Sequence, residues 1–236
     1  MNAALKPLDR TFVVGPFQCN CRLLACPKTG EAALVDPGDE PQVILEQLEK
    51  AAKDARALGL PEPRVTALFH THGHLDHIGA TRSVKEALAV RGGDIAEIWL
   101  HAADIPLYEQ LQMQGKLFGL DYEQPLPVEK RFEDEQTLKI GQLKLTVLHT
   151  PGHSPGSVSL RLHEDSSLGT AETVYTGDTL FRESVGRTDL WGADGDAMFR
   201  SIRRRLLTLD DDTRVCPGHG PESSVGHEKR NNPFLT

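Results

Sequence analysis

The chain has 236 residues, of which 39% are apolar, so it is long enough to bury a full hydrophobic core. Its formal charge is −8 at pH 7 and its basic residues are scattered apart from Arg203-Arg204-Arg205, which disfavours a nucleic-acid partner. No apolar run approaches the ~20 residues that span a bilayer, and the N-terminus lacks the order of a signal peptide, so we expect no membrane association and a cytoplasmic location.

The first part of the chain predicts an antiparallel meander followed by a helix. Short apolar runs separated by Gly and Pro predict strands at 11–14, 22–26 and 32–35. Apolar residues at helical spacing then begin after Asp39-Glu40-Pro41 and end near Leu58-Gly59-Leu60-Pro61, which carries the expected stop residues.

A dense group of potential metal ligands follows the next predicted strand, 64–69. The run His72-Gly73-His74-Leu75-Asp76-His77 places four such residues within six positions. Imidazole nitrogens and carboxylate oxygens suit borderline divalent ions such as Zn²⁺. Because these side chains occupy alternate and adjacent positions, some can face one ion and some a second. The run therefore indicates two metal ions.

Beyond this run, the pattern predicts a helix at 79–90 and a strand at 95–100. The region from Tyr108 to Arg131 is rich in Gln, Gly and Pro, so we predict an irregular lid or substrate loop over the site. Further strands are predicted at 137–140, 143–148, 157–162, 173–176 and 214–216, with a helix at 196–209. Strands followed by a helix occur twice, which suggests two similar halves that face each other.

Three further candidate ligands, His153, Asp178 and His219, each follow a predicted strand. Loops from strand ends can converge on one edge of a fold, so we expect these side chains to join the first run. A glycine beside each of them permits a sharp turn of the backbone toward an ion.

Together these motifs resemble the metallo-β-lactamase fold superfamily over nearly the whole chain. Further segments resemble its hydroxyacylglutathione hydrolase (glyoxalase II) branch: Val35-Asp36-Pro37-Gly38, Thr150-Pro151-Gly152-His153-Ser154-Pro155-Gly156-Ser157, Thr176-Gly177-Asp178-Thr179-Leu180-Phe181 and Asn232-Pro233-Phe234-Leu235. The resemblance implies a single domain over residues 1–236, folded as a four-layer αβ/βα sandwich with two mixed sheets flanked by helices. It also implies a metal-dependent hydrolase of a glutathione thioester such as S-lactoylglutathione.

The resemblance further implies how the ligands divide between two divalent ions. His72, His74 and His153 would hold the first ion, Asp76, His77 and His219 the second, and Asp178 would bridge both. A hydroxide between the ions would be the nucleophile, so Asp76 and Asp178 are the expected catalytic residues. Zinc is the expected metal, and iron or manganese would also accept these nitrogen and oxygen donors.

Several residues have two possible roles, one of which is contact with the substrate. Arg187 is expected either to bind a substrate carboxylate or to pair with Asp189, because Arg–carboxylate forks serve ligands and scaffolds alike. The aromatic side chains of Phe118, Tyr122 and Trp191 are expected to line an acyl pocket or to serve in packing.

The remaining polar candidates have expected structural roles. Asp36 either orients a ligand imidazole or forms a turn before Pro37-Gly38. The four cysteines lack Cys-x-x-Cys spacing, so we expect reduced, partly buried thiols at Cys19, Cys21, Cys26 and Cys216. Five histidines are expected to be structural or exposed: His70, His101, His149, His163 and His227.

The chain also departs from long glyoxalase II enzymes, because it ends soon after the His219 loop. It therefore resembles the short branch, which lacks the full C-terminal helical domain that binds glutathione. Three alternatives remain: an iron-dependent persulfide dioxygenase, which shares the ligands and a Gly-Arg-Thr-Asp loop; a lactone or ester hydrolase; and a non-catalytic module with structural metals. We expect a small-molecule thioester partner and a monomer or dimer.

Overall fold

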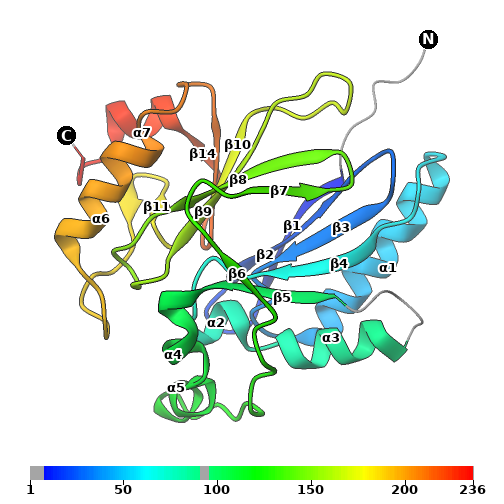
Figure 1. Ribbon diagram of the computed structural model, residues 1–236, viewed down its shortest axis with the longest axis horizontal. Coiled ribbons are helices and arrows are strands. Elements are labelled where there is room, and N and C mark those ends of the chain that lie inside the picture. Colours follow the sequence, from blue (N-terminus) through cyan, green and yellow to red (C-terminus); the bar gives the residue numbers. More distant parts are fainter. Residues whose placement is uncertain (1–7, 91–95, 236) are drawn as a thin grey trace.

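The computed structural model describes residues 8–90 and 96–235 and is built around two large mixed sheets (Figure 1). In order across the first sheet lie β1 (Leu8–Val14), β2 (Cys19–Ala25), β3 (Glu31–Val35), β4 (Arg64–Phe69), β5 (Glu97–His101) and β6 (Lys130–Phe132). Across the second lie β14 (Ser223–Ser224), β13 (Arg214–Pro217), β10 (Thr173–Gly177), β9 (Val158–Leu162), β8 (Leu143–His149) and β7 (Thr137–Ile140). A separate pair is formed by β11 (Leu180–Phe181) and β12 (Ser184–Val185).

Helices cover the outer faces of both sheets (Figure 1). The main helices are α1 (Pro41–Ala57), α3 (Thr81–Val90), α6 (Gly195–Ser201) and α7 (Val225–Asn231). Shorter segments are α2 (Leu75–Ile78), the 3-10 turn η1 (Ala102–Asp104), α4 (Ile105–Tyr108), α5 (Leu111–Leu117) and the π-helical η2 (Ile202–Leu206). Among the described residues, no helix has the length and apolar character needed to cross a bilayer.

Three hydrophobic clusters give the order of the layers. The first joins the outer face of the first sheet to α1 and α3, for example Leu34 with Ile44 and Val84. The second cluster lies between the sheets and joins Leu24 and Val35 to side chains of β8 and β9. The third cluster joins the second sheet to α6, η2 and α7. Because neighbouring strand residues such as Leu34 and Val35 enter different clusters, both faces of the first sheet are buried. The predicted four-layer αβ/βα sandwich is confirmed.

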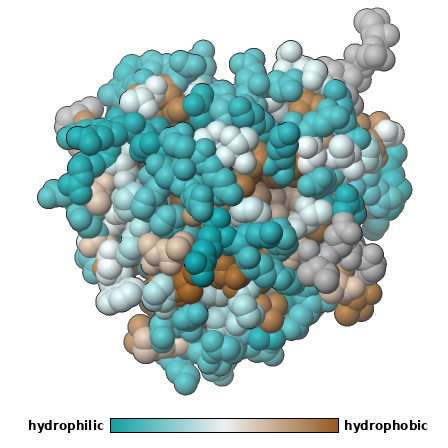
Figure 2. All heavy atoms as spheres, in the orientation of Figure 1, coloured by the Kyte–Doolittle hydropathy of each residue, from teal (hydrophilic) through white to brown (hydrophobic). Residues whose placement is uncertain are grey.

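The strand directions bring several loops to one edge. In the first sheet β4 runs parallel to β3 and β5, and in the second β10 runs parallel to β13. The loops that leave the ends of β4, β8, β10 and β13 carry all the candidate ligands. The face drawn in Figure 2 is largely hydrophilic, with apolar atoms gathered below its centre.

Two sequence-based predictions need correction. The segment 108–131 is not wholly irregular, because α5 forms within it with Leu111 and Gly115 buried. The helix predicted at 196–209 is α6 followed by the wider η2 turn. The strand predicted at 95–100 is β5, and position 95 lies outside the described residues.

Candidate metal centre

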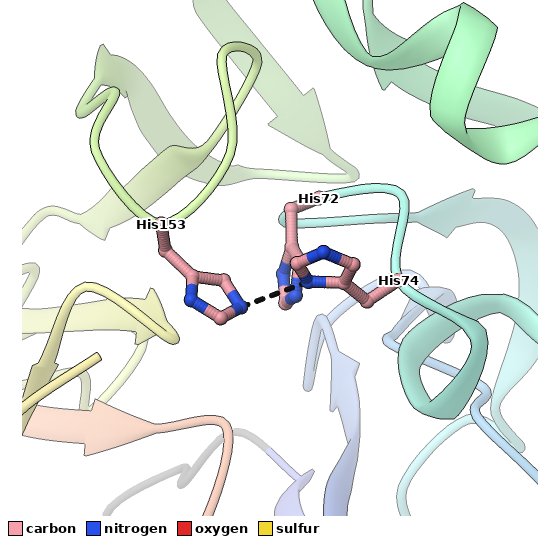
Figure 3. Close-up of side chains that lie close together, drawn as sticks. All are labelled: His72, His74 and His153. Atoms are coloured by element: carbon pink, nitrogen blue, oxygen red, sulfur yellow. Dashed lines mark hydrogen bonds between the residues drawn. The ribbon is translucent and has the colours of Figure 1, made fainter. Parts of the chain in front are cut away.

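The run after β4 meets the three later loops, as the sequence predicted. Donor atoms that lie within 4.8 Å of one another form three overlapping groups: His72, His74 and His153; His72, His77 and Asp178; and Asp76, His77 and His219. In Figure 3 the rings of His72 and His74 approach that of His153 from the opposite side. Each group combines the loop of the first sheet with a loop of the second, so the site lies across the junction of the two sheets.

Distances between donors match the size of a metal coordination sphere. Nδ1 of His74 lies 2.8 Å from Nε2 of His153, and Nε2 of His77 lies 3.2 Å from Nε2 of His219. Tetrahedral zinc with Zn–N bonds of about 2.0–2.1 Å would place its nitrogen ligands about 3.3 Å apart. Both pairs of imidazoles therefore converge closely enough to share an ion.

The Asp178 carboxylate lies between the two outer groups. Its Oδ2 is 3.6 Å from Nε2 of His153 and 3.6 Å from Nε2 of His219, while its Oδ1 is 3.4 Å from Nε2 of His77. Two glycines make this placement possible. Gly177 has φ +48°, and a Cβ on Gly218 would lie 2.4 Å from Asp178 Oδ1.

Asp36 orients two of the imidazoles from beneath the site. His77 donates from Nδ1 to Asp36 Oδ2 over 3.0 Å, which leaves Nε2 directed at the cluster. Thr71 Oγ1 donates to the same carboxylate oxygen (2.8 Å) and lies 3.1 Å from Nδ1 of His72, from which it accepts. The Asp36 side chain thus accepts hydrogen bonds that orient imidazoles of the site. Its backbone, with φ +52°, also forms the turn after β3.

Backbone carbonyls orient two more imidazoles. Nδ1 of His153 donates to the carbonyl of Arg187 (2.9 Å), and Nδ1 of His219 donates to the carbonyl of Gln18 (3.2 Å). In both rings the free lone pair is therefore on Nε2, which faces the cluster. Sequence reasoning missed both acceptors, because every residue has a carbonyl and no side-chain pattern marks them.

Electrostatics favour the cation-binding form of three members of the cluster. Burial and the neighbouring imidazoles hold the pKa of His72 well below its ordinary value, and burial together with His153 lowers the pKa of His74 to about 3. Burial opposes ionisation of Asp178, but the nearby imidazoles, His77 foremost, outweigh it and hold the pKa of this carboxyl well below its usual range. At pH 7 His72, His74 and Asp178 are therefore two neutral rings and a carboxylate, the forms that act as metal ligands. Burial alone would lower the pKa of His77, but Cys19 and the neighbouring carboxylates raise it well above its ordinary value, so this ring must lose a proton when it binds a metal.

Two buried acceptors in the cluster lack a hydrogen-bond partner among the described residues. His72 Nε2 and Asp178 Oδ1 are buried and make no hydrogen bond among the described residues. A buried polar atom without a partner is costly, and a buried carboxylate more so. A divalent cation would satisfy both atoms, so the donor set fits a metal ion.

Comparison with known proteins agrees with this geometry. The model of the metallo-beta-lactamase superfamily matches residues 14–219. The chain belongs to this superfamily. A curated member, hydroxyacylglutathione hydrolase GloC of Haemophilus influenzae, is 35% identical over 224 residues, which cover 94% of this chain and 95% of GloC.

Two solved structures of the superfamily are similar over almost their full length. The di-iron-bound form of TTHA1623 is 40% identical, with a TM-score of 0.75 over 96% of this chain and 100% of that one. The B3 metallo-beta-lactamase BLEG-1 is 32% identical, with a TM-score of 0.78 over 97% and 99%. The superfamily match, these relatives and the donor cluster support a metallo-hydrolase of this fold.

The residues predicted to contact substrate lie outside the three donor groups. Arg187 forms a bidentate pair with Asp189 at 2.9 and 3.0 Å, and both side chains are exposed. Tyr122 is half-buried and donates to Asp39 Oδ2 over 3.1 Å. Trp191 is 69% exposed. Phe118 is also exposed, and its ring meets that of Phe17 edge to face at 5.1 Å.

Other polar residues have structural surroundings. All four cysteines are free and fully buried rather than partly buried. His70 is buried beside Thr81, and the rings of His101 and His149 stack at 4.2 Å. His163 contacts Thr146, and His227 pairs with Glu183.

Proposed function

We propose that this chain is a metal-dependent thioester hydrolase that acts on glutathione conjugates such as S-lactoylglutathione. The observation that carries the proposal is the overlap of the three donor groups, with the Asp178 carboxylate between the outer two. The full-length similarity to a protein named hydroxyacylglutathione hydrolase supports the choice of substrate class.

The donors divide between two ions as the family resemblance implies. We assign His72, His74 and His153 to the first ion, Asp76, His77 and His219 to the second, and Asp178 to both. When bound, such ions supply a water molecule whose pKa is lowered to about 7 and a Lewis acid that polarises the thioester carbonyl. Zinc suits the nitrogen-rich donor set, and the di-iron-bound form of TTHA1623 favours iron as the alternative.

The substrate would approach from the side of the second donor group. The side chains of His219 and Asp76 are 25% and 19% exposed, whereas His72 and His153 of the first group are buried. The backbone of Gln18 holds His219, so the preceding residue, Phe17, lies beside this opening. With Phe118 it offers an apolar wall that an acyl chain could contact.

The chain's own residues would keep the site ready for this reaction. Asp36, together with Thr71, would hold His72 and His77 at their Nδ1 atoms, so that each Nε2 faces the cluster. Burial of His72 and His153 limits access of bulk water, which strengthens the interaction of the Asp178 carboxylate with a cation.

The test is hydrolysis of S-D-lactoylglutathione by purified protein, with metal removed by a chelator and then restored. We expect two metal ions per chain, loss of turnover on chelation and recovery with zinc or iron. A matched variant, His163→Ala, removes an imidazole outside the site and should behave as the wild type. Fully metallated protein that does not turn over the thioester would contradict the proposal.

The same assay series addresses the alternatives. Oxygen uptake with glutathione persulfide by iron-loaded protein would indicate the dioxygenase, and turnover of a lactone, an ester or a β-lactam would indicate another hydrolase of this fold. Cytoplasmic location, a single domain and a monomer or dimer remain predictions.

A further inference from the structure

A buried carboxylate outside the donor groups joins the two loops that carry the first group. Asp104 ends the η1 turn after β5, and its side chain is fully buried. Its Oδ2 accepts from the backbone N–H of Gly73 (2.8 Å) and from Ser154 Oγ (2.6 Å), while its Oδ1 accepts from the backbone N–H of Gly156 (2.5 Å). Each of these three hydrogen bonds comes from a ligand loop.

Two of the three donors to Asp104 directly neighbour the first-group histidines. Gly73 lies between His72 and His74, and Ser154 follows His153. The first loop leaves β4 of the first sheet, and the second connects β8 to β9 of the second sheet. Asp104 therefore sets the separation of the two loops at the point where His74 and His153 come within 2.8 Å.

Both loops pack closely against Asp104 at a glycine. A Cβ on Gly156 would lie 2.7 Å from the carboxyl carbon of Asp104, and a Cβ on Gly73 would lie 3.0 Å from its backbone oxygen. Only glycine permits both approaches. Gly73 therefore allows close packing against Asp104 as well as a turn of the backbone after His72.

The second donor group has a different support. Asp36 accepts directly from His77, whereas Asp104 makes no hydrogen bond to the loops that carry Asp178 and His219. We propose that Asp104 is a positioning residue that preorganises the first metal site by fixing the His72–His74 loop against the His153 loop. This inference rests on the metal site of the proposed function.

The carboxylate form is required by the arrangement of donors. The two backbone N–H groups reach different oxygens, Gly73 to Oδ2 and Gly156 to Oδ1. In Asp104→Asn, either orientation of the amide places an NH₂ group against one backbone N–H, and two donors repel. Loss of a partner that orients metal ligands typically weakens metal affinity by about 10–100-fold.

The experiment compares Asp104→Asn with the matched control Glu228→Gln. Glu228 is also a fully buried carboxylate with three hydrogen-bond donors, from Glu183, Ser223 and Asn232, but it supports α7 rather than a ligand loop. Chelator-stripped proteins are titrated with Zn²⁺ against a chromophoric chelator, and thermal unfolding of the stripped forms reports on the fold. A His219→Ala background, which lacks one donor of the second group, identifies the first site.

We expect Asp104→Asn to weaken Zn²⁺ binding at the first site by about 10–100-fold, with the second site within threefold of wild type and Glu228→Gln unchanged at both. Wild-type affinity at both sites in Asp104→Asn, or an equal loss at both, would overturn the inference. If Asp104→Asn does not fold, Ser154→Ala is tested instead, because it removes one of the three hydrogen bonds to Asp104. Weaker Zn²⁺ binding at the first site would support the inference, and unchanged Zn²⁺ binding there would refute it. Wild-type protein that binds neither Zn²⁺ nor Fe²⁺ would instead refute the proposed function.

Discussion

Removal of the Asp9 carboxylate should destabilise the fold far more than removal of an exposed partner of similar chemistry. Asp9 in β1 pairs with Arg22 of β2 (3.1 Å) and with Arg214 of β13, so it joins the two sheets. The side chains of Asp9 and Arg22 are only 9% and 4% exposed. Arg22 also lies 5.2 Å over the ring of Tyr175.

The size of the effect follows from this burial. Asp9→Ala leaves the Arg22 guanidinium buried, with Glu222 as its remaining carboxylate partner. Breaking a buried pair on one side costs about 3–5 kcal/mol, because the other charge stays desolvated. For a chain of 236 residues, at about 2–4 °C per kcal/mol, this lowers Tm by about 6–20 °C.

The assay is urea unfolding of metal-stripped protein followed by circular dichroism, with Asp54→Ala as the control. Asp54 pairs with Arg10 at 2.7 Å, but these side chains are 44% and 26% exposed, so the control should lose at most about 1 kcal/mol. Equal losses in the free energy of unfolding for the two variants would refute the argument that burial decides the cost.

Four further outcomes are expected. Asp178→Ala should abolish turnover with the far-ultraviolet spectrum retained, since it removes the carboxylate between the donor groups; wild-type rates would exclude the two-metal mechanism. His163→Ala should change stability by no more than about 1 kcal/mol in a thermal scan, because its ring is part-exposed and contacts Thr146. Arg187→Ala should keep wild-type Zn²⁺ affinity in a competition titration, because His153 is held by the carbonyl of Arg187 and not by its guanidinium. Chelation should lower Tm: free metal at 100 times Kd adds about 2.7 kcal/mol per site, so metal-independent melting would argue against binding by the native state.

Much of the fold could be predicted because its signals are local. Strands such as β3 and β10 are apolar runs bounded by turn residues, and burial of such runs between layers is what forms the sheets. The helix α5 escaped prediction because only Leu111 and Gly115 of its seven residues are buried. A tertiary contact stabilises it instead, since Gln114 bonds to the backbone of Leu75 and Gly73.

The members of the donor cluster were predictable, and so was a role for Asp36 in orienting an imidazole, but the other supports were not. His72, His74, Asp76 and His77 form a motif whose density has few explanations other than metal binding. The partner of Gly73, in contrast, is a lone aspartate 31 positions away, and nothing in the spacing pairs them. The substrate-contact predictions rested on residue type alone, which left two roles open for Arg187, and the structure shows the pair with Asp189.

The wide spacing of the donors along the chain has a consequence for the protein during its synthesis. His74 and His153 are 79 positions apart, and His77 and His219 are 142 apart. A chain that emerges from the ribosome N-terminus first therefore presents four donors long before their counterparts exist. The first group can close once the β8–β9 turn has emerged, and the second only after β13 has joined its sheet. Under the proposed division of the donors, the first site can therefore be assembled earlier in synthesis than the second.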